Sequence, residues 1–267
     1  PRVAEQLGNL GAAALKLGHY ESARDNLQRA LAIQETALGP DHPGVATSCN
    51  SLGFIAVTLA DYEGAWGAFQ RALAIWAKTY GEDSRLVAIA HIHLGRVLHA
   101  RGYLVEAQAE FQHALAIFEG AVGPDHPEAA TAYRYMGLLL MDLGDPEEAL
   151  SACRRALTIR EAALGQNHPN FARDMHAFGQ VLQARGDSEG AQAAYQRALT
   201  VWEDTYGREH PETAQALWGL GKVAAGIGDT GTAREYLGQA LAILERSLPP
   251  AHPDIRALSS QLETLSE

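Results

Sequence analysis

One complete copy of a repeating pattern occupies residues 39–80, with the sequence GPDHPGVATSCNSLGFIAVTLADYEGAWGAFQRALAIWAKTY. Its fixed points are Gly53, Ala65, the aromatic Phe69 and Ala72. The glycine recurs at a period of 42 residues, as Gly11, Gly53, Gly95, Gly137, Gly179 and Gly221. The other points recur with it, and no insertion or deletion separates the copies. A fixed period of this size is typical of a stacked-repeat solenoid, and it predicts the fold before any other residue is considered.

Each copy predicts two helices joined by a tight turn. The linker 39–43 ends in Pro43, and proline is favoured in the first turn of a helix. Helix A is therefore expected from about Gly44 to Leu59. Glycine–aspartate turns such as Gly144-Asp145 end one helix and cap the next, and helix B then continues to about Tyr80 in the second copy.

The repeat divides the chain into consecutive helix pairs. The predicted pairs are residues 1–38, 39–80, 81–122, 123–164, 165–206 and 207–248. After Leu248 the pattern fades, and residues 249–267 are predicted to form a C-terminal capping helix with Ile255, Leu258 and Leu262 on one face. The first residue, Pro1, occupies the same repeat position as Pro43, which suggests that the sequence is a fragment of a longer protein.

The order Leu52-Gly53, then Ala65-x3-Phe69-x2-Ala72, resembles the tetratricopeptide (TPR) pattern, whose unit spans about 34 residues and ends in proline. Helix formers such as Glu35 and Ala77 replace that proline, so helix B should run on by roughly two turns. The 42-residue form with its Gly-Pro-Asp-His-Pro linker is similar to the TPRs of kinesin light chains and of bacterial multidomain signalling ATPases (STAND/NB-ARC type). The resemblance implies an all-α, right-handed α-solenoid that acts as a non-catalytic protein-interaction scaffold, as the sensor part of a larger signalling protein.

Composition excludes several other classes. The net charge is −11 and dense Lys/Arg clusters are absent, so we expect no nucleic-acid partner. No apolar run reaches the roughly 18 residues of a membrane span, so we expect no membrane partner. Cys49 and Cys153 fall on buried positions two repeats apart, which predicts reduced thiols in a cytoplasmic protein.

No motif predicts an enzyme, a cofactor or a metal site. Residues 186–190 match the G-x-S-x-G nucleophile elbow, but they fall on a turn between helices A and B, whereas the elbow needs a preceding strand. A histidine stands before the linker proline at the same position of most repeats. Residues at equivalent positions of successive repeats lie on different layers of a solenoid, so these histidines cannot bind one metal ion together. We expect them to form local hydrogen bonds at helix starts; they are His42, His126, His168, His210 and His252.

The positions at which the repeats differ are the candidates for specificity. The TPR resemblance implies that helix A lines a concave groove and that helix B lies on the convex side. Three positions around the repeat glycine should face that groove, and the candidate peptide-binding residues are Asn50, Phe54, Ile92, Arg96, His99, Arg134, Leu138, Met141, His176, Gln180, Trp218 and Lys222. The set is apolar with basic points and holds no acid, which favours a protein or peptide with carboxylates and one or two apolar anchors.

Two alternatives stay open at this point. The helix A arginines could be merely solvated, with no role in binding. The protein could instead self-associate, either through its open N-terminal edge or through the convex face. The convex-face hypothesis expects exposed aromatic residues at one position of helix B, namely Trp76, Phe118 and Trp202.

Overall fold

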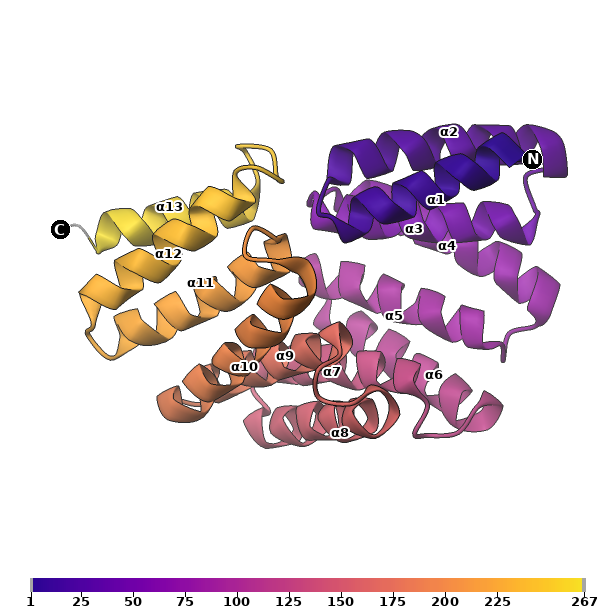
Figure 1. Cartoon of the computed structure of the whole chain (residues 1–267). Helices are drawn as coiled ribbons and strands as arrows, with labels where there is room; N and C mark the ends of the chain where they lie inside the picture. The colour runs from indigo at the N-terminus through magenta and orange to yellow at the C-terminus, as the bar shows by residue number, and fades with distance from the viewer. Residues whose placement is uncertain (1, 266–267) are drawn as a thin grey trace. The chain divides into compact units, whose positions relative to one another are not determined.

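The computed structural model describes residues 2–265, and within them it contains thirteen α-helices and no strand (Figure 1). This confirms the all-α prediction. The chain forms two compact units, which meet between Pro124 and Asp125 in the sequence. The first unit holds α1 (Arg2–Lys16), α2 (Tyr20–Leu38), α3 (Pro43–Thr58), α4 (Tyr62–Tyr80), α5 (Arg85–Ala100) and α6 (Leu104–Ala121). The second holds α7 (Pro127–Asp142), α8 (Pro146–Leu164), α9 (Pro169–Ala184), α10 (Ser188–Tyr206), α11 (Pro211–Gly226), α12 (Thr230–Leu244) and α13 (Pro253–Thr264).

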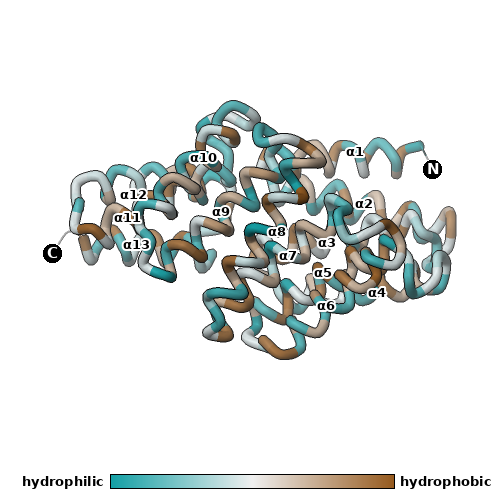
Figure 2. The backbone as a smooth tube through the Cα atoms, turned by 90° about the horizontal axis from the view of Figure 1, so that it is seen from below, coloured by the Kyte–Doolittle hydropathy of each residue, from teal (hydrophilic) through white to brown (hydrophobic). Residues whose placement is uncertain are grey.

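The helices pack as consecutive pairs within each unit. Odd-numbered helices are A-helices and even-numbered helices are B-helices. Each A-helix from α1 to α11 packs most extensively against the B-helix that follows it. Inside a unit, an A-helix also packs against the B-helix before it, as α3 does on α2 and α9 does on α8. Hydrophobic and hydrophilic residues alternate in short stretches along the helices, as expected for helices that bury part of their surface (Figure 2).

The repeat glycine lies where the two helices of a pair approach most closely. A Cβ atom built on Gly53 would lie 2.6 Å from Cε1 of Phe69, and one on Gly95 would lie 2.6 Å from Cε1 of Phe111. A side chain at either position would therefore push helix B away, since such a separation is far shorter than van der Waals contact. Close packing of the two helices therefore explains why glycine recurs at this position.

The helix starts carry the expected hydrogen bonds. Nδ1 of His42 accepts from the backbone N–H of Gly44 at 3.0 Å, and the four other linker histidines make the same bond two residues ahead. Oδ1 of Asp61 accepts from the backbone N–H of Gly64 at 2.9 Å, and the aspartates of three later turns act in the same way. These bonds satisfy backbone donors that a helix leaves unpaired at its first turn, so the linker histidines have a structural role.

One turn departs from the common design. The residue that ends helix A has positive φ at Gly18, Gly102, Gly144, Gly186 and Gly228, but the second copy has Ala60 there, with φ 60°. A side chain in the left-handed region is disfavoured by contact of its Cβ with the backbone. This turn therefore stores local strain that the glycine turns avoid.

Candidate protein-binding face

The twelve candidate residues all lie on A-helices; we call them the A-helix face. The first unit contributes residues of α3 and α5, and the second contributes residues of α7, α9 and α11. Gln180 is exposed, whereas Ile92 and Trp218 are buried and offer little surface to a partner. The other nine are half-buried, namely Asn50, Phe54, Arg96, His99, Arg134, Leu138, Met141, His176 and Lys222.

In the first unit, Arg96 is held by aromatic rings. Its guanidinium carbon lies 5.2 Å from the centroid of the Phe54 ring, and Nη1 lies 3.5 Å from Nδ1 of His93. The His93 ring stacks on Phe69 at 4.8 Å between centroids. An arginine over an aromatic face gains a cation–π interaction and keeps a fixed orientation, so Arg96 is a preorganised cation on this face.

Asn50 adds an unsatisfied acceptor to the same unit. Its Oδ1 atom is buried and has no hydrogen-bond partner within the protein. A buried polar atom without a partner costs free energy, and most such atoms in folded proteins are paired. A donor supplied by a bound segment would remove that cost.

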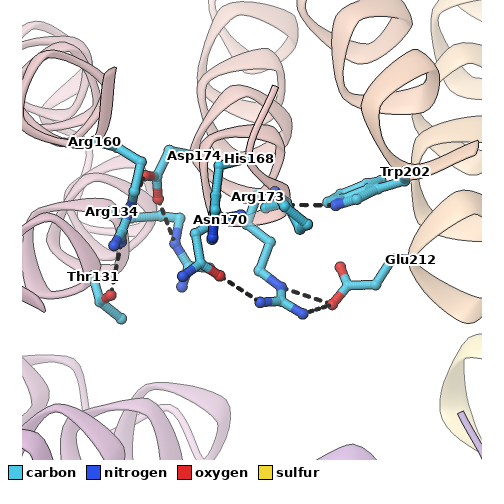
Figure 3. A network of polar contacts seen from close by, with 10 residues as sticks. Thr131, Arg134, Arg160, His168, Asn170, Arg173, Asp174, Trp202 and Glu212 are labelled. Carbon is cyan, nitrogen blue, oxygen red and sulfur yellow. Dashed lines mark hydrogen bonds and ion pairs between the residues drawn. The ribbon is translucent and has the colours of Figure 1, made fainter. Parts of the chain in front are cut away.

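In the second unit, a buried ion-pair network joins three helices (Figure 3). Nε of Arg160 on α8 donates to Oδ2 of Asp174 on α9 at 2.8 Å, and Nη2 of Arg160 donates to Oγ1 of Thr131 on α7 at 2.9 Å. Nε of Arg134 on α7 forms an ion pair with Oδ1 of Asp174 at 3.0 Å. The side chains of Arg160 and Asp174 are 4% and 0% exposed, so water scarcely screens them.

A second ion pair lies beside the first (Figure 3). Nε of Arg173 donates to Oε1 of Glu212 at 2.7 Å, and Nη1 donates to Oδ1 of Asn170 at 2.7 Å. Burial raises the pKa of Glu212, but the Arg173 charge and hydrogen bond outweigh it and hold the pKa below its usual value. Arg173 therefore has its main partners within the protein.

The sequence-based estimate of a basic face needs correction here. The candidate set holds no acid, yet Asp174 and Glu212, at neighbouring positions, lie against the arginines of this face. Three guanidiniums (Arg134, Arg160 and Arg173) meet two carboxylates, which leaves 3 − 2 = +1 in the cluster. Arg134, with 14% of its side chain exposed, shares its carboxylate with Arg160.

His176 and Lys222 both pack against aromatic rings, and burial lowers the pKa of each. The His176 ring packs near Tyr195 and Trp202, with centroid separations of 5.2 and 5.7 Å, and its Nε2 lies 3.2 Å from the carbonyl oxygen of Gln215. Burial lowers the pKa of His176 to about 4, so its ring is neutral at pH 7. Nζ of Lys222 lies 4.2 Å from the centroid of Trp218, and burial also lowers the pKa of this lysine.

Arg160 and Asp174 are not among the candidates predicted from the sequence, although the repeats carry a signal for them. Arg160 occupies the helix B position that holds Trp76, Phe118 and Trp202 in other copies. The position of Asp174 holds alanine in three other copies, namely Ala90, Ala132 and Ala216. An opposite-charge pair at two positions that are uncharged in every other copy indicates a buried ion pair.

The convex-face hypothesis for self-association is wrong as stated. Trp76, Phe118 and Trp202 are buried rather than exposed, because this position of helix B packs between helices. Nε1 of Trp202, for example, donates to the carbonyl oxygen of Pro169 at 3.3 Å. These aromatics are core residues and offer no surface to a second molecule.

The serine motif and the two cysteines lie in structural positions. The G-x-S-x-G segment lies at the turn between α9 and α10, where Oδ1 of Asp187 accepts from the backbone N–H of Gly190. Residues 2–265 contain no group of three or more His, Cys, Asp or Glu side chains placed to hold a metal ion. Cys49 and Cys153 are buried free thiols, and burial raises the pKa of Cys153 to about 12. None of the helices described is long and apolar enough to span a membrane.

The sequence matches a known family along nearly its whole length. The tetratricopeptide-repeat profile matches residues 2–75, 52–119, 93–140, 128–201 and 175–246. The chain therefore belongs to the tetratricopeptide-repeat family, whose members are generally non-catalytic modules of protein interaction. No curated protein shows significant sequence similarity to it.

Solved structures show the same fold. BtubC (BKLC) from P. vanneervenii has a TM-score of 0.60 at 18% identity, over 90% of this chain and 91% of that one. TPR-like repeats assigned to a kinesin light chain of Podosopora anserina have a TM-score of 0.53 at 21% identity, over 75% and 95%. A Rap protein complexed with competence and sporulation factor has a TM-score of 0.68 at 16% identity, over 97% and 73%. These similarities define a kinesin-light-chain-like TPR fold.

Proposed function

We propose that the A-helix face binds a segment of another protein, and that a carboxylate of that segment pairs with Arg134 in the second unit. The single observation that carries this proposal is the charge imbalance around Asp174, where one carboxylate serves both Arg134 and Arg160. A partly buried guanidinium without a full counter-charge is costly, and a ligand carboxylate would supply that charge in a directional contact.

The first unit supports the same proposal with different groups. Arg96 lies over Phe54 and offers a second cation, while Asn50 Oδ1 can accept a hydrogen bond from a backbone N–H of the bound segment. Half-buried Leu138 and Met141 on α7 provide apolar contact beside Arg134. A segment with carboxylates and one or two apolar anchors matches these groups.

The array would serve as the sensor part of a larger bacterial signalling protein in the cytoplasm, with the A-helix face forming a concave groove. The similar fold of a Rap protein solved with competence and sporulation factor is in line with a sensor role, and the free thiols of Cys49 and Cys153 are in line with a reducing compartment.

The test is selection of binding peptides from a random library on the immobilised protein, followed by affinity measurement with single variants. Arg96→Glu and Arg134→Glu should each weaken the selected peptides by at least about tenfold, because a charge-assisted hydrogen bond contributes roughly 1.5–3 kcal/mol. Arg134→Gln is a milder change that removes the charge, and it should weaken acidic peptides more than neutral ones.

Arg154→Glu is the matched control, since Arg154 is an exposed arginine on B-helix α8. It should leave binding unchanged. Selected peptides that lack acidic residues, or affinities that respond equally to all of these charge changes, would refute the proposed carboxylate contact.

A second candidate function is self-association through the N-terminal edge. It is favoured by Val3 and Leu10 of α1, each 57% exposed. Sedimentation velocity over a wide concentration range tests it directly. A monomer at every concentration would exclude this candidate.

A further inference from the structure

Helix α1 carries an apolar surface that its own unit leaves uncovered. Val3, Gln6, Leu10 and Ala13 are exposed, and their spacing places them along one side of the helix. We call these four residues the α1 stripe. Large apolar residues on a single exposed stripe are a feature of interaction sites.

The same four repeat positions are covered in later A-helices. Val3 corresponds to Val45 of α3 and Val87 of α5, which are both 0% exposed. The equivalents of Gln6, Leu10 and Ala13 in α5 are buried as well, namely Ala90, Leu94 and Val97. The positions of the α1 stripe are therefore those that an A-helix normally buries.

The contacts of α3 and α5 identify what covers this surface. Ile55 of α3, at the position of Ala13, packs in one cluster with Ala23 and Leu27 of the preceding B-helix α2. Leu94 and Val97 of α5 pack in the same way with the alanine and the aromatic residue of B-helix α4, Ala65 and Phe69. In both cases the covering helix presents alanine and, four residues later, a large apolar side chain.

The C-terminal end of the second unit repeats this arrangement. Helix α13 packs on B-helix α12, and it buries Ile255 and Leu258, which stand at the positions of Val3 and Gln6. Helix α12 carries the same pattern, with Ala233 followed four residues later by Leu237, and both are buried. In each unit, therefore, an A-helix surface of this kind packs on a B-helix that carries this pattern.

We propose that the α1 stripe is a docking site for an amphipathic helix of this B type, with the pattern Ala-x3-Leu or Ala-x3-Phe on its apolar face. The incoming helix would take the place that α2 takes on α3 and α4 takes on α5. This inference uses the same edge as the second candidate function, but it specifies the chemistry of the bound helix and does not require a second copy of the chain.

The test uses the full chain and a fluorescently labelled synthetic peptide of residues 62–80, the sequence of α4. Fluorescence anisotropy should show saturable binding. Leu10→Glu should weaken it by about 30-fold or more, because the variant removes an apolar contact and places a charge in the interface. Val3→Glu should act in the same direction, and both sites are exposed, so neither change should unfold the protein.

Matched controls distinguish specific docking from nonspecific binding of the peptide. Val105→Glu, at a residue of α6 that is 71% exposed, should leave the affinity unchanged. A peptide with Phe69→Ser should bind much more weakly than the parent peptide. No saturable binding at millimolar peptide, or equal affinity for the Leu10→Glu and Val105→Glu proteins, would overturn the proposal.

Sedimentation velocity distinguishes peptide docking on the α1 stripe from self-association of the protein. Peptide binding by a protein that stays monomeric would support the docking site and exclude the second candidate function. Self-association that Leu10→Glu abolishes, without peptide binding, would identify a second copy as the occupant and overturn the B-type helix.

Discussion

Removal of Asp174 should destabilise the protein far more than removal of an exposed carboxylate. Asp174→Ala leaves Arg160, with 4% of its side chain exposed, without its carboxylate, and it also removes the ion-pair partner of Arg134. An isolated buried charge of this kind costs about 3–5 kcal/mol. Asp125→Ala breaks the exposed pair with Arg155 and should cost less than about 1 kcal/mol.

The double variant Arg160→Trp/Asp174→Ala sharpens this prediction. It recreates the tryptophan and alanine that stand at these two positions as Trp202 and Ala216. Replacement of a buried ion pair by well-packed apolar residues is often neutral or stabilising, so the double variant should recover to within about 1 kcal/mol of the wild type.

Urea unfolding followed by circular dichroism gives the free energies, and the double-mutant cycle gives the coupling between the two residues. The coupling should be at least about 2 kcal/mol, taken from the same range for breaking a buried pair. A loss of less than about 1 kcal/mol for Asp174→Ala would refute the argument that the buried pair is poorly screened. A double variant no more stable than Asp174→Ala alone would refute it as well.

Two further predictions concern strain and pH. Ala60→Gly should raise the free energy of unfolding by about 1 kcal/mol, because it removes the side chain from a residue in the left-handed conformation at φ 60°. Gly102→Ala should lower the free energy of unfolding by a similar amount, which urea unfolding measures. The folded-state pKa of His176 lies below the unfolded value of 6.5, so its stabilising contribution is full above pH 6.5 and is lost as the pH falls toward 4. His176→Gln should therefore flatten the decline of stability with acid in this range by up to about 1.4 kcal/mol per pH unit, and equal slopes for variant and wild type would contradict this.

The fold could be predicted from the sequence because its signals are local and are repeated. Gly53 and Phe69 recur as a spacing that only close packing of two helices explains, and Pro43 and Asp61 mark the starts of helices A and B. Each signal is weak in a single copy, but six copies at one period reinforce it. The linker histidines show the same advantage, since their common phase indicated a cap rather than a metal site.

The candidate face could be predicted only in part. Sequence periodicity identifies which A-helix residues occupy equivalent positions in the repeats, but it does not show how deeply each one is buried. Ile92 and Trp218, for example, are buried. Nor does it show which charges meet in space. Arg134 is separated from Asp174 by 40 positions in the sequence, and the ion pair depends on how α7 and α9 pack. For the same reason, the buried Trp76, Phe118 and Trp202 were expected to be exposed.

The Arg160–Asp174 pair also bears on how the chain selects correct partners while it folds. Most A-helices and B-helices here carry interchangeable apolar surfaces, so a B-helix could pair with the wrong A-helix and shift the chain by one repeat. Helix α8 cannot make that exchange without burying Arg160 against Ser48, Ala90, Ala132, Ala216 or Leu258, none of which carries a charge. The Arg160–Asp174 ion pair therefore favours the packing of α8 on α9. It disfavours arrangements shifted by one repeat, which the alanines at the equivalent positions would otherwise allow.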